Sequence, residues 1–124
     1  MADDRPKANG LPRTARVRLG HEFRRVKEGG QRLVCGCLIA NWLVLPAGNG
    51  SRLGVVTSRR IGGAVVRNRA RRLMRETFRL NQDRLKAPAD MVLVARASIA
   101  GKSRQEVERD YFTILRRAGL LKES

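Results

Sequence analysis

The first apolar spacing along the chain is helical. Leu19, Phe23 and Val26 follow one another at i, i+4 and i+7, with charged residues between them. One face of a helix collects positions with this spacing, so the pattern predicts a short helix over residues 19–28. A pair of glycines follows directly, and we expect it to end the helix.

Two apolar runs come next and predict strands. Residues 33–45 are rich in Val, Leu, Ile and Trp, enough for one strand or two, and residues 53–58 form a second run. Residues 47–51 lie between the runs and include glycine and asparagine, which tolerate the positive φ of tight turns. We therefore expect the two runs to pair as a hairpin.

The second half of the chain alternates between helix and strand. A long helical pattern follows a second pair of glycines and is expected to end near Leu85, because Ala87–Ala89 contains a proline. Residues 90–96 predict a buried strand, and Ser103 with Glu106 forms a capping box for a last helix. This order predicts an α+β fold with one small sheet and helices packed mainly on one face.

Length and composition are those of one domain. A chain of 124 residues with 42% apolar residues can bury a single core. Residues 1–18 lack apolar periodicity, which predicts a flexible basic arm. We expect residues 19–120 to form the folded domain and residues 121–124 a short C-terminal tail.

The net charge of the chain indicates which class of partner it binds. Lys and Arg number 27 against 11 Asp and Glu, a net charge of +16. Such an excess repels itself in a compact chain unless a polyanion neutralises it, and nucleic acid and an anionic membrane surface are both polyanions. Most of the cations are arginine, whose forked guanidinium suits phosphates and base edges, so we favour nucleic acid.

The sequence shows no membrane or export signal. No run approaches the ~18 apolar residues that a membrane span needs. Residues 1–18 lack the apolar core of a signal peptide. We therefore expect a cytoplasmic protein without a membrane partner.

Residues 64–80 gather much of this charge on one side of a helix. At about 100° per residue, one face should pack on the sheet; it comprises Val66, Ala70, Leu73, Met74, Thr77, Phe78 and Leu80. The opposite face comprises Asn68, Arg71, Arg72, Arg75 and Arg79.

The like charges on this helix repel one another at i, i+3 and i+4. Glu76 alone lies near enough to offset them. The face is either a solvated cationic surface or, as we favour, a surface kept for a polyanion. Arg67 and Arg69 lie at its two boundaries, where they could serve the fold or the partner.

Residues 58–76, SRRIGGAVVRNRARRLMRE, closely resemble the signature of the bacterial ribonuclease P protein subunit. That signature is S-[KR]-[KR]-x-G-x-A-V-x-R-N-R-x-[KR]-R-x-x-R-E, and every fixed position is matched. The resemblance covers residues 16–118. It implies an α/β sandwich with a small mixed sheet, in which the arginine-rich helix lies in a left-handed βαβ crossover. Periodicity does not show that hand, which runs against the general rule.

The resemblance also implies a function. In that family the RNA subunit cleaves precursor tRNA with bound Mg²⁺, while the protein binds the RNA subunit and the 5′ leader and lowers the magnesium requirement. No catalytic residue, bound metal or small-molecule substrate is then expected in the protein. The residues implied to face the catalytic RNA are Arg67, Asn68, Arg69, Arg71, Arg72 and Arg75, and the helical wheel adds Arg79.

The resemblance further implies a cleft, formed by the sheet and the first helix, that holds the single-stranded leader. Phe23 matches an aromatic residue of that cleft, although it could equally just pack the helix on the sheet. Arg59, Arg60 and Arg96 are the expected phosphate contacts at its edge. The chain has Lys27 where many members have a second aromatic residue, and Ala97 where they often have lysine.

Other functions fit less well. Hydrolysis by the protein itself would need a base or clustered carboxylates, and His21 is the only histidine. Residues 95–103 resemble a phosphate-binding loop, but Arg96 occupies the place of its first glycine. A ribosomal or DNA-binding module is compatible with the charge, although no small helical DNA-binding motif or paired half-site arrangement is evident.

Cys35 and Cys37 are the only cysteines. The Cys-Gly-Cys spacing places both on one face of any strand there. We interpret them as small buried thiols, because a reducing compartment disfavours a disulfide and too few further ligands are present for a metal.

Overall fold

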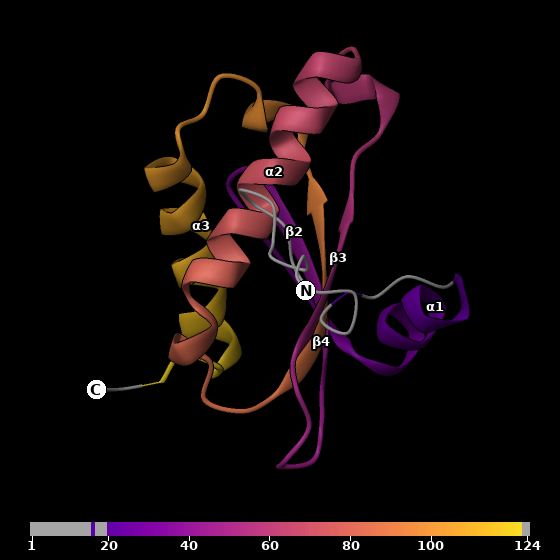
Figure 1. The fold of residues 1–124 in the computed structure, drawn as a ribbon, viewed down its shortest axis with the longest axis vertical. Coiled ribbons are helices and arrows are strands. Elements are labelled where there is room, and N and C mark those ends of the chain that lie inside the picture. The colour runs from indigo at the N-terminus through magenta and orange to yellow at the C-terminus, as the bar shows by residue number, and fades with distance from the viewer. Residues whose placement is uncertain (1–15, 17–19, 123–124) are drawn as a thin grey trace, which may run out of the picture.

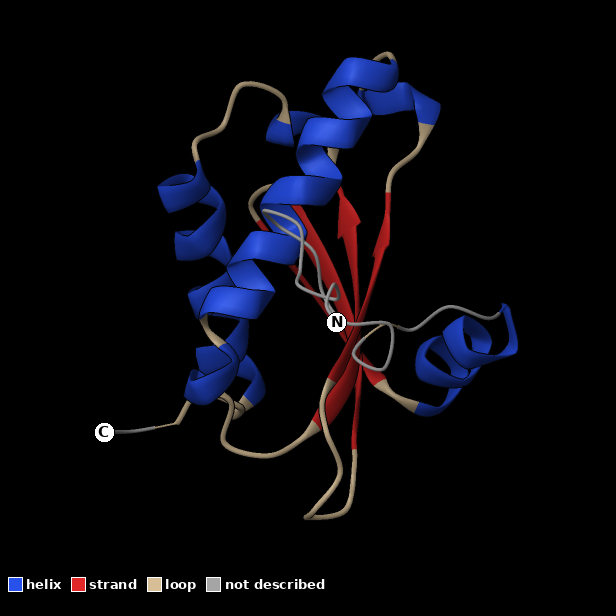
Figure 2. Ribbon diagram, viewed as in Figure 1, coloured by secondary structure: helices blue, strands red, loops and turns tan. Residues whose placement is uncertain are grey.

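A computed structural model describes Arg16 and residues 20–122, so most of the predicted N-terminal arm and the last two residues lie outside the described part. The elements are, in chain order, α1 (Gly20–Gly29), β1 (Gln31–Cys35), β2 (Leu38–Val44), β3 (Arg52–Val56), the 3₁₀ turn η3 (Arg59–Ile61), α2 (Ala64–Leu80), η4 (Gln82–Arg84), β4 (Ala89–Ala95), η5 (Ala97–Ile99) and α3 (Arg104–Ala118). The predicted order of helices and strands is confirmed (Figure 2).

The four strands form one mixed sheet in the order β1-β2-β4-β3. β2 pairs antiparallel with both β1 and β4, whereas β3 pairs parallel with β4. Helix α2 connects the parallel pair and makes a βαβ crossover, whose hand stays a prediction. β4 is buried along nearly its whole length, as a central strand with both faces covered must be.

The expected hairpin between residues 33–45 and 53–58 is wrong, because β3 does not pair with β2. The first run divides instead, and β1 and β2 form the hairpin. The turn is at Gly36, whose φ of +58° favours glycine. The Asp110 carboxylate of α3 accepts a hydrogen bond from the Cys37 backbone N–H at 3.0 Å and holds the turn. β3 instead pairs with the edge of β4 that β2 leaves free.

Helices cover both faces of the sheet unequally (Figure 1). α2 and α3 lie together on one face and enclose the main core, which includes Met74, Phe78, Met91 and Tyr111. α1 lies on the other face, where Val26 packs against Val92 of β4. The predicted α+β class with helices mainly on one face is confirmed.

α2 ends at Leu80, five residues before the expected Leu85. The Asn81 side chain terminates it, since its Nδ2 donates to the Thr77 carbonyl at 2.8 Å and to Glu108 of α3 at 2.6 Å. The predicted capping box at Ser103 is present, with both of its reciprocal hydrogen bonds. Leu121 pairs with Leu85 in an isolated bridge, so the chain stays attached to the domain past residue 120.

A buried ion pair fixes α1 to the sheet. Asp90 at the start of β4 is 1% exposed, and Arg52 of β3 donates to its two oxygens at 2.9 and 2.8 Å. Arg52 also donates to Glu22 of α1 at 3.0 Å. Hydrogen bonding to Asp90 raises the pKa of the Arg52 guanidinium, although burial opposes this. Arg25 lies farther away, 3.6 Å from Asp90, with a side chain 51% exposed.

Two alanine substitutions compare these arginines. R52A should lower the free energy of unfolding by about 3 kcal/mol, because it leaves the buried Asp90 charge without its main partner. R25A should cost less than about 1 kcal/mol, as expected for a solvent-exposed pair. Urea denaturation of both variants measures the difference, and equal losses would contradict this account of the pair.

Candidate nucleic-acid interface

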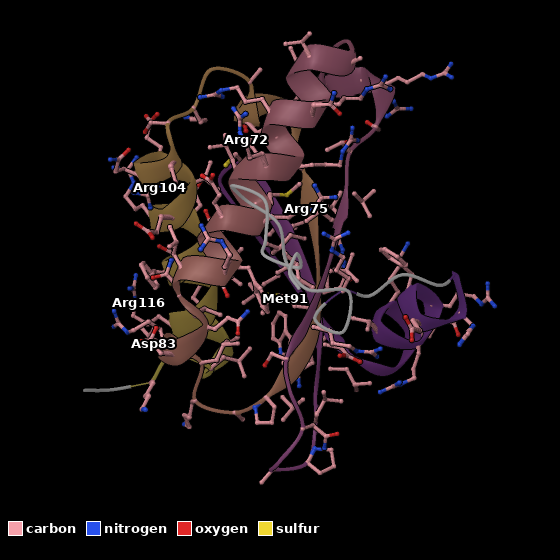
Figure 3. The ribbon with its side chains drawn as sticks, viewed as in Figure 1. Arg72, Arg75, Asp83, Met91, Arg104 and Arg116 are labelled. Atoms are coloured by element: carbon pink, nitrogen blue, oxygen red, sulfur yellow. The ribbon has the colours of Figure 1, made fainter. Side chains whose placement is uncertain are left out.

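Helix α2 has one apolar and one cationic side, as the wheel predicts. Its buried residues are Ala70, Leu73, Met74, Thr77 and Phe78. On the other side Asn68 and Arg72 are exposed, while Arg71, Arg75 and Arg79 are half-buried. Figure 3 shows Arg72 and Arg75 on this helix and Met91 on the sheet. The prediction that Leu80 packs on the core is wrong, because this last helical residue extends past the core and is 47% exposed.

The first three turns of α2 form a shallow concavity of about 440 Å³ on its cationic side. Its lining residues are Val65, Asn68, Arg69, Arg71, Arg72 and Arg75. Five of these six are candidates from the sequence, and the fold brings them together because they lie within three turns of one helix. Val65 was not a candidate.

Hydrogen bonds order two of these arginines before any partner binds. Arg71 donates to the Thr57 hydroxyl after β3 at 2.6 Å, and its other terminal nitrogen donates to the Asn68 side-chain oxygen. Arg69 donates to the Lys102 backbone carbonyl at 2.8 Å and so links α2 to the segment before α3. Arg69 therefore has a structural contact, which leaves its other N–H groups for a partner.

The charge of this side is not neutralised within the described part of the chain. The carboxylates of that part pair elsewhere: Asp90 and Glu22 pair with Arg52, Glu108 pairs with Arg104, Glu106 caps α3, and Asp110 accepts from the Cys37 backbone. Partial burial lowers the pKa of the Arg75 guanidinium, and the positive charges of Arg16 and Arg71 lower it further. A bound anion would relieve this repulsion.

Arg67 and Arg79 lie apart from the concavity. Both are half-buried, and in each the Nε atom is buried with no hydrogen-bond partner among the described residues. For Arg67 this burial matches the expected position at the boundary of the apolar face.

The three other candidate arginines lie at one end of the sheet. Arg59 and Arg60 follow β3, Arg96 follows β4, and all three are exposed. Because β3 and β4 are parallel, their carboxyl ends meet at the same edge. Arg96 donates to the Gly36 carbonyl of the hairpin turn at 3.0 Å, which holds its guanidinium at this edge.

An apolar row crosses the α1 face of the sheet beside these arginines. Val34, Ile39, Val94 and Val56 stand opposite one another on the four strands in register. All four remain partly exposed, because α1 covers only the part of the face near Val92. This row could not be found from the sequence alone, since it depends on the strand register.

Phe23 of α1 lies at the boundary between the covered and the open parts of that face. It is half-buried and packs with Val56 and Val94 against the smaller core cluster. Its packing role is therefore present in the structure, and part of its ring remains accessible. Lys27, four residues on, is exposed.

The described residues contain no group of three or more His, Cys, Asp or Glu placed to hold a metal ion. None of the helices in this part of the chain is long and apolar enough to cross a membrane. Cys37 is buried in the main core and Cys35 is half-buried against the same core, so both lie on the side of α2 and α3, although Cys37 belongs to the turn and not to a strand. Burial raises the pKa of the Cys37 thiol to about 12.

Solved structures share this fold. The ribonuclease P protein of Staphylococcus aureus superposes with a TM-score of 0.77 at 20% identity, over 87% of this chain and 98% of that one. The ribonuclease P protein of Thermotoga maritima superposes with a TM-score of 0.72 at 27% identity, over 82% of this chain and 96% of that one.

Proteins with similar sequences indicate the same family as these structures. The ribonuclease P protein component of Syntrophomonas wolfei is 41% identical over 110 residues, 89% of this chain and 92% of that protein. The component of Chloroflexus aurantiacus is 41% identical over 113 residues, 90% of this chain and 82% of that protein. The family model described as Ribonuclease P matches residues 11–119. The chain therefore belongs to the Ribonuclease P family, that of the bacterial ribonuclease P protein component.

Proposed function

We propose that this chain is the protein subunit of a bacterial ribonuclease P, which removes the 5′ leader from precursor tRNA in the cytoplasm. The catalytic RNA binds the cationic side of α2, and the leader lies on the open face of the sheet. Catalysis belongs to the RNA and its Mg²⁺, and the protein contributes binding.

The observation that carries this proposal is the unneutralised charge of α2. Arg71, Arg72 and Arg75 lie on one side of one helix with no carboxylate partner among the described residues. Each phosphate that they neutralise releases condensed counterions, which is a large part of the affinity of proteins for nucleic acid.

The sheet supports the second half of the proposal. Its apolar row, with Val94 at the centre, offers a surface for the faces of unpaired bases, and Phe23 lies beside it. Arg59, Arg60 and Arg96 at the end of the sheet would contact the phosphates of the same strand. A single strand satisfies both features, because its bases and its phosphates are accessible together.

Charge also explains why less magnesium would be needed. RNA that folds compactly and binds a second RNA must screen phosphate repulsion, and free Mg²⁺ does so in the absence of protein. Arginine side chains fixed on α2 and at the sheet end supply some of that positive charge at defined places.

Reconstitution tests the function. Addition of the protein to a bacterial ribonuclease P RNA should lower the magnesium concentration at which precursor tRNA is half-maximally cleaved at its mature 5′ end. A double variant, R72Q with R75Q, should produce a smaller shift at the same protein concentration. Cleavage at low magnesium that stays unchanged over a wide range of protein concentrations would contradict the proposal.

Substitution of one arginine tests the assigned face. R75A should weaken binding to the RNA subunit and reduce the slope of log K against log salt by about one unit or less, because one phosphate contact is lost. R116A is the matched control, since Arg116 is exposed near the C-terminal end of α3, well away from Arg72 in Figure 3. Equal effects of the two variants would count against the α2 face.

The two roles of Phe23 can be separated with a pair of substitutions. F23L keeps most of the apolar packing but removes the aromatic ring, so its thermal stability should stay close to that of the unmodified protein. If the ring contacts the leader, F23L should weaken binding of precursor tRNA while binding of mature tRNA is unchanged. If F23L binds both substrates normally and only F23A loses stability, Phe23 serves packing alone.

A further inference from the structure

Val65 contributes nothing visible to the fold. It lies in the first turn of α2, and its side chain is 81% exposed, the highest value among the large apolar residues of the described chain. The next residue, Val66, packs on the core instead. Valine is a poorer helix former than alanine, because its branched side chain loses rotamer freedom, so an exposed valine here lowers helix stability.

The surroundings of Val65 are unusual for an apolar side chain. It lines the concavity on α2, and every other lining residue is arginine or asparagine. Val65, Asn68, Arg69 and Arg72 are spaced i, i+3, i+4 and i+7, so they form one continuous strip of the helix. A single exposed valine is ordinary on a protein surface. At the end of a cationic concavity, however, a valine gives an otherwise charged site one apolar side.

The hydrogen bonds in the concavity restrict what can fill it. The Asn68 side-chain oxygen already accepts from Arg71, and Arg69 is partly used by the Lys102 carbonyl. What remains is mostly donors, namely the Asn68 amide N–H₂ and the free N–H groups of the guanidinium side chains, beside the second lone pair of the Asn68 oxygen. The concavity therefore selects a ligand with negative charge, further acceptors and an apolar face.

We infer that this concavity holds one unpaired nucleotide of the RNA subunit, with Val65 against the face of its base. This inference rests on the proposed function and identifies a site within it. An unpaired nucleotide has phosphate oxygens for Arg72 and Arg75, acceptors on its base edge for Asn68, and an exposed ring face for Val65. A phosphate within a regular helix would use the arginines but leave Val65 without a contact. The volume of about 440 Å³ is in the range of sites that bind small molecules.

The test compares V65A with V66A, its neighbour on the core side. V65A should unfold at the same urea concentration as the unmodified protein or a slightly higher one, whereas V66A should unfold at a lower one. V65A should nevertheless weaken binding of the ribonuclease P RNA by about three- to tenfold, the effect of losing one buried apolar contact. The salt slope should not change, because no phosphate contact is lost. Normal RNA affinity in V65A, or a reduced slope, would overturn the inference.

Chemical probing of the RNA provides the second readout. A reagent that acylates the 2′-hydroxyl of flexible nucleotides should show an unpaired position that the unmodified protein protects and that V65A leaves reactive. Protection that is identical with V65A and the unmodified protein would overturn the inference. The R75A variant separates failure of the nucleotide site from failure of the proposed function. If R75A weakens binding and V65A does not, only the nucleotide site fails. If neither variant changes binding, the α2 face itself is wrong.

Discussion

The packing of α2 into the core is the constraint on which the cationic face depends. Met74 and Phe78 are 0% exposed, and full burial of such a side chain contributes about 2 kcal/mol or more. Each like-charge pair on the opposite side costs only a few tenths of a kcal/mol. Packing therefore outweighs repulsion, and the helix can display arginines without internal neutralisation. The cost in repulsion is recovered when an anion binds, which makes the surface selective for one.

The topology brings the two proposed RNA sites to the same end of the molecule. β3 leads through η3 directly into α2, and the parallel pairing of β3 with β4 places Arg59, Arg60 and Arg96 beside the start of that helix. The sheet has an α1 face that is only partly covered, because α2 and α3 both pack on the other face (Figure 1). Arg52, which is paired with Asp90, also donates to Glu22 of α1 and so holds α1 to one part of that face. The apolar row next to it thus stays open.

Most local features of the fold could be predicted from the sequence, whereas the strand pairing and the contacts between distant residues could not. The faces of α2 and the capping box at Ser103 depend on residues within a few turns, and both are present. The hairpin was wrong because strand pairing depends on distant residues: β4, more than thirty positions after β3 begins, separates β3 from β2. Three further features join residues that are distant in the sequence and could not be predicted for the same reason. They are the open row around Val94, the Arg52–Asp90 pair and the Arg69 contact with Lys102. The wheel leaves Val65 off the sheet-facing side, but an uncharged residue gives no sign of a binding site until the concavity around it is known.

The most direct measurement is modification of arginine side chains by a dicarbonyl reagent, quantified residue by residue by mass spectrometry with and without a bacterial ribonuclease P RNA. Arg72 on α2 is exposed and Arg75 half-buried, and Arg116 and Arg117 on α3 are exposed, so one experiment contains both the test and its control. RNA should protect Arg72 and Arg75 and leave Arg116 and Arg117 reactive. Protection of the α3 arginines with Arg72 and Arg75 still reactive would contradict the assignment of the α2 face to RNA.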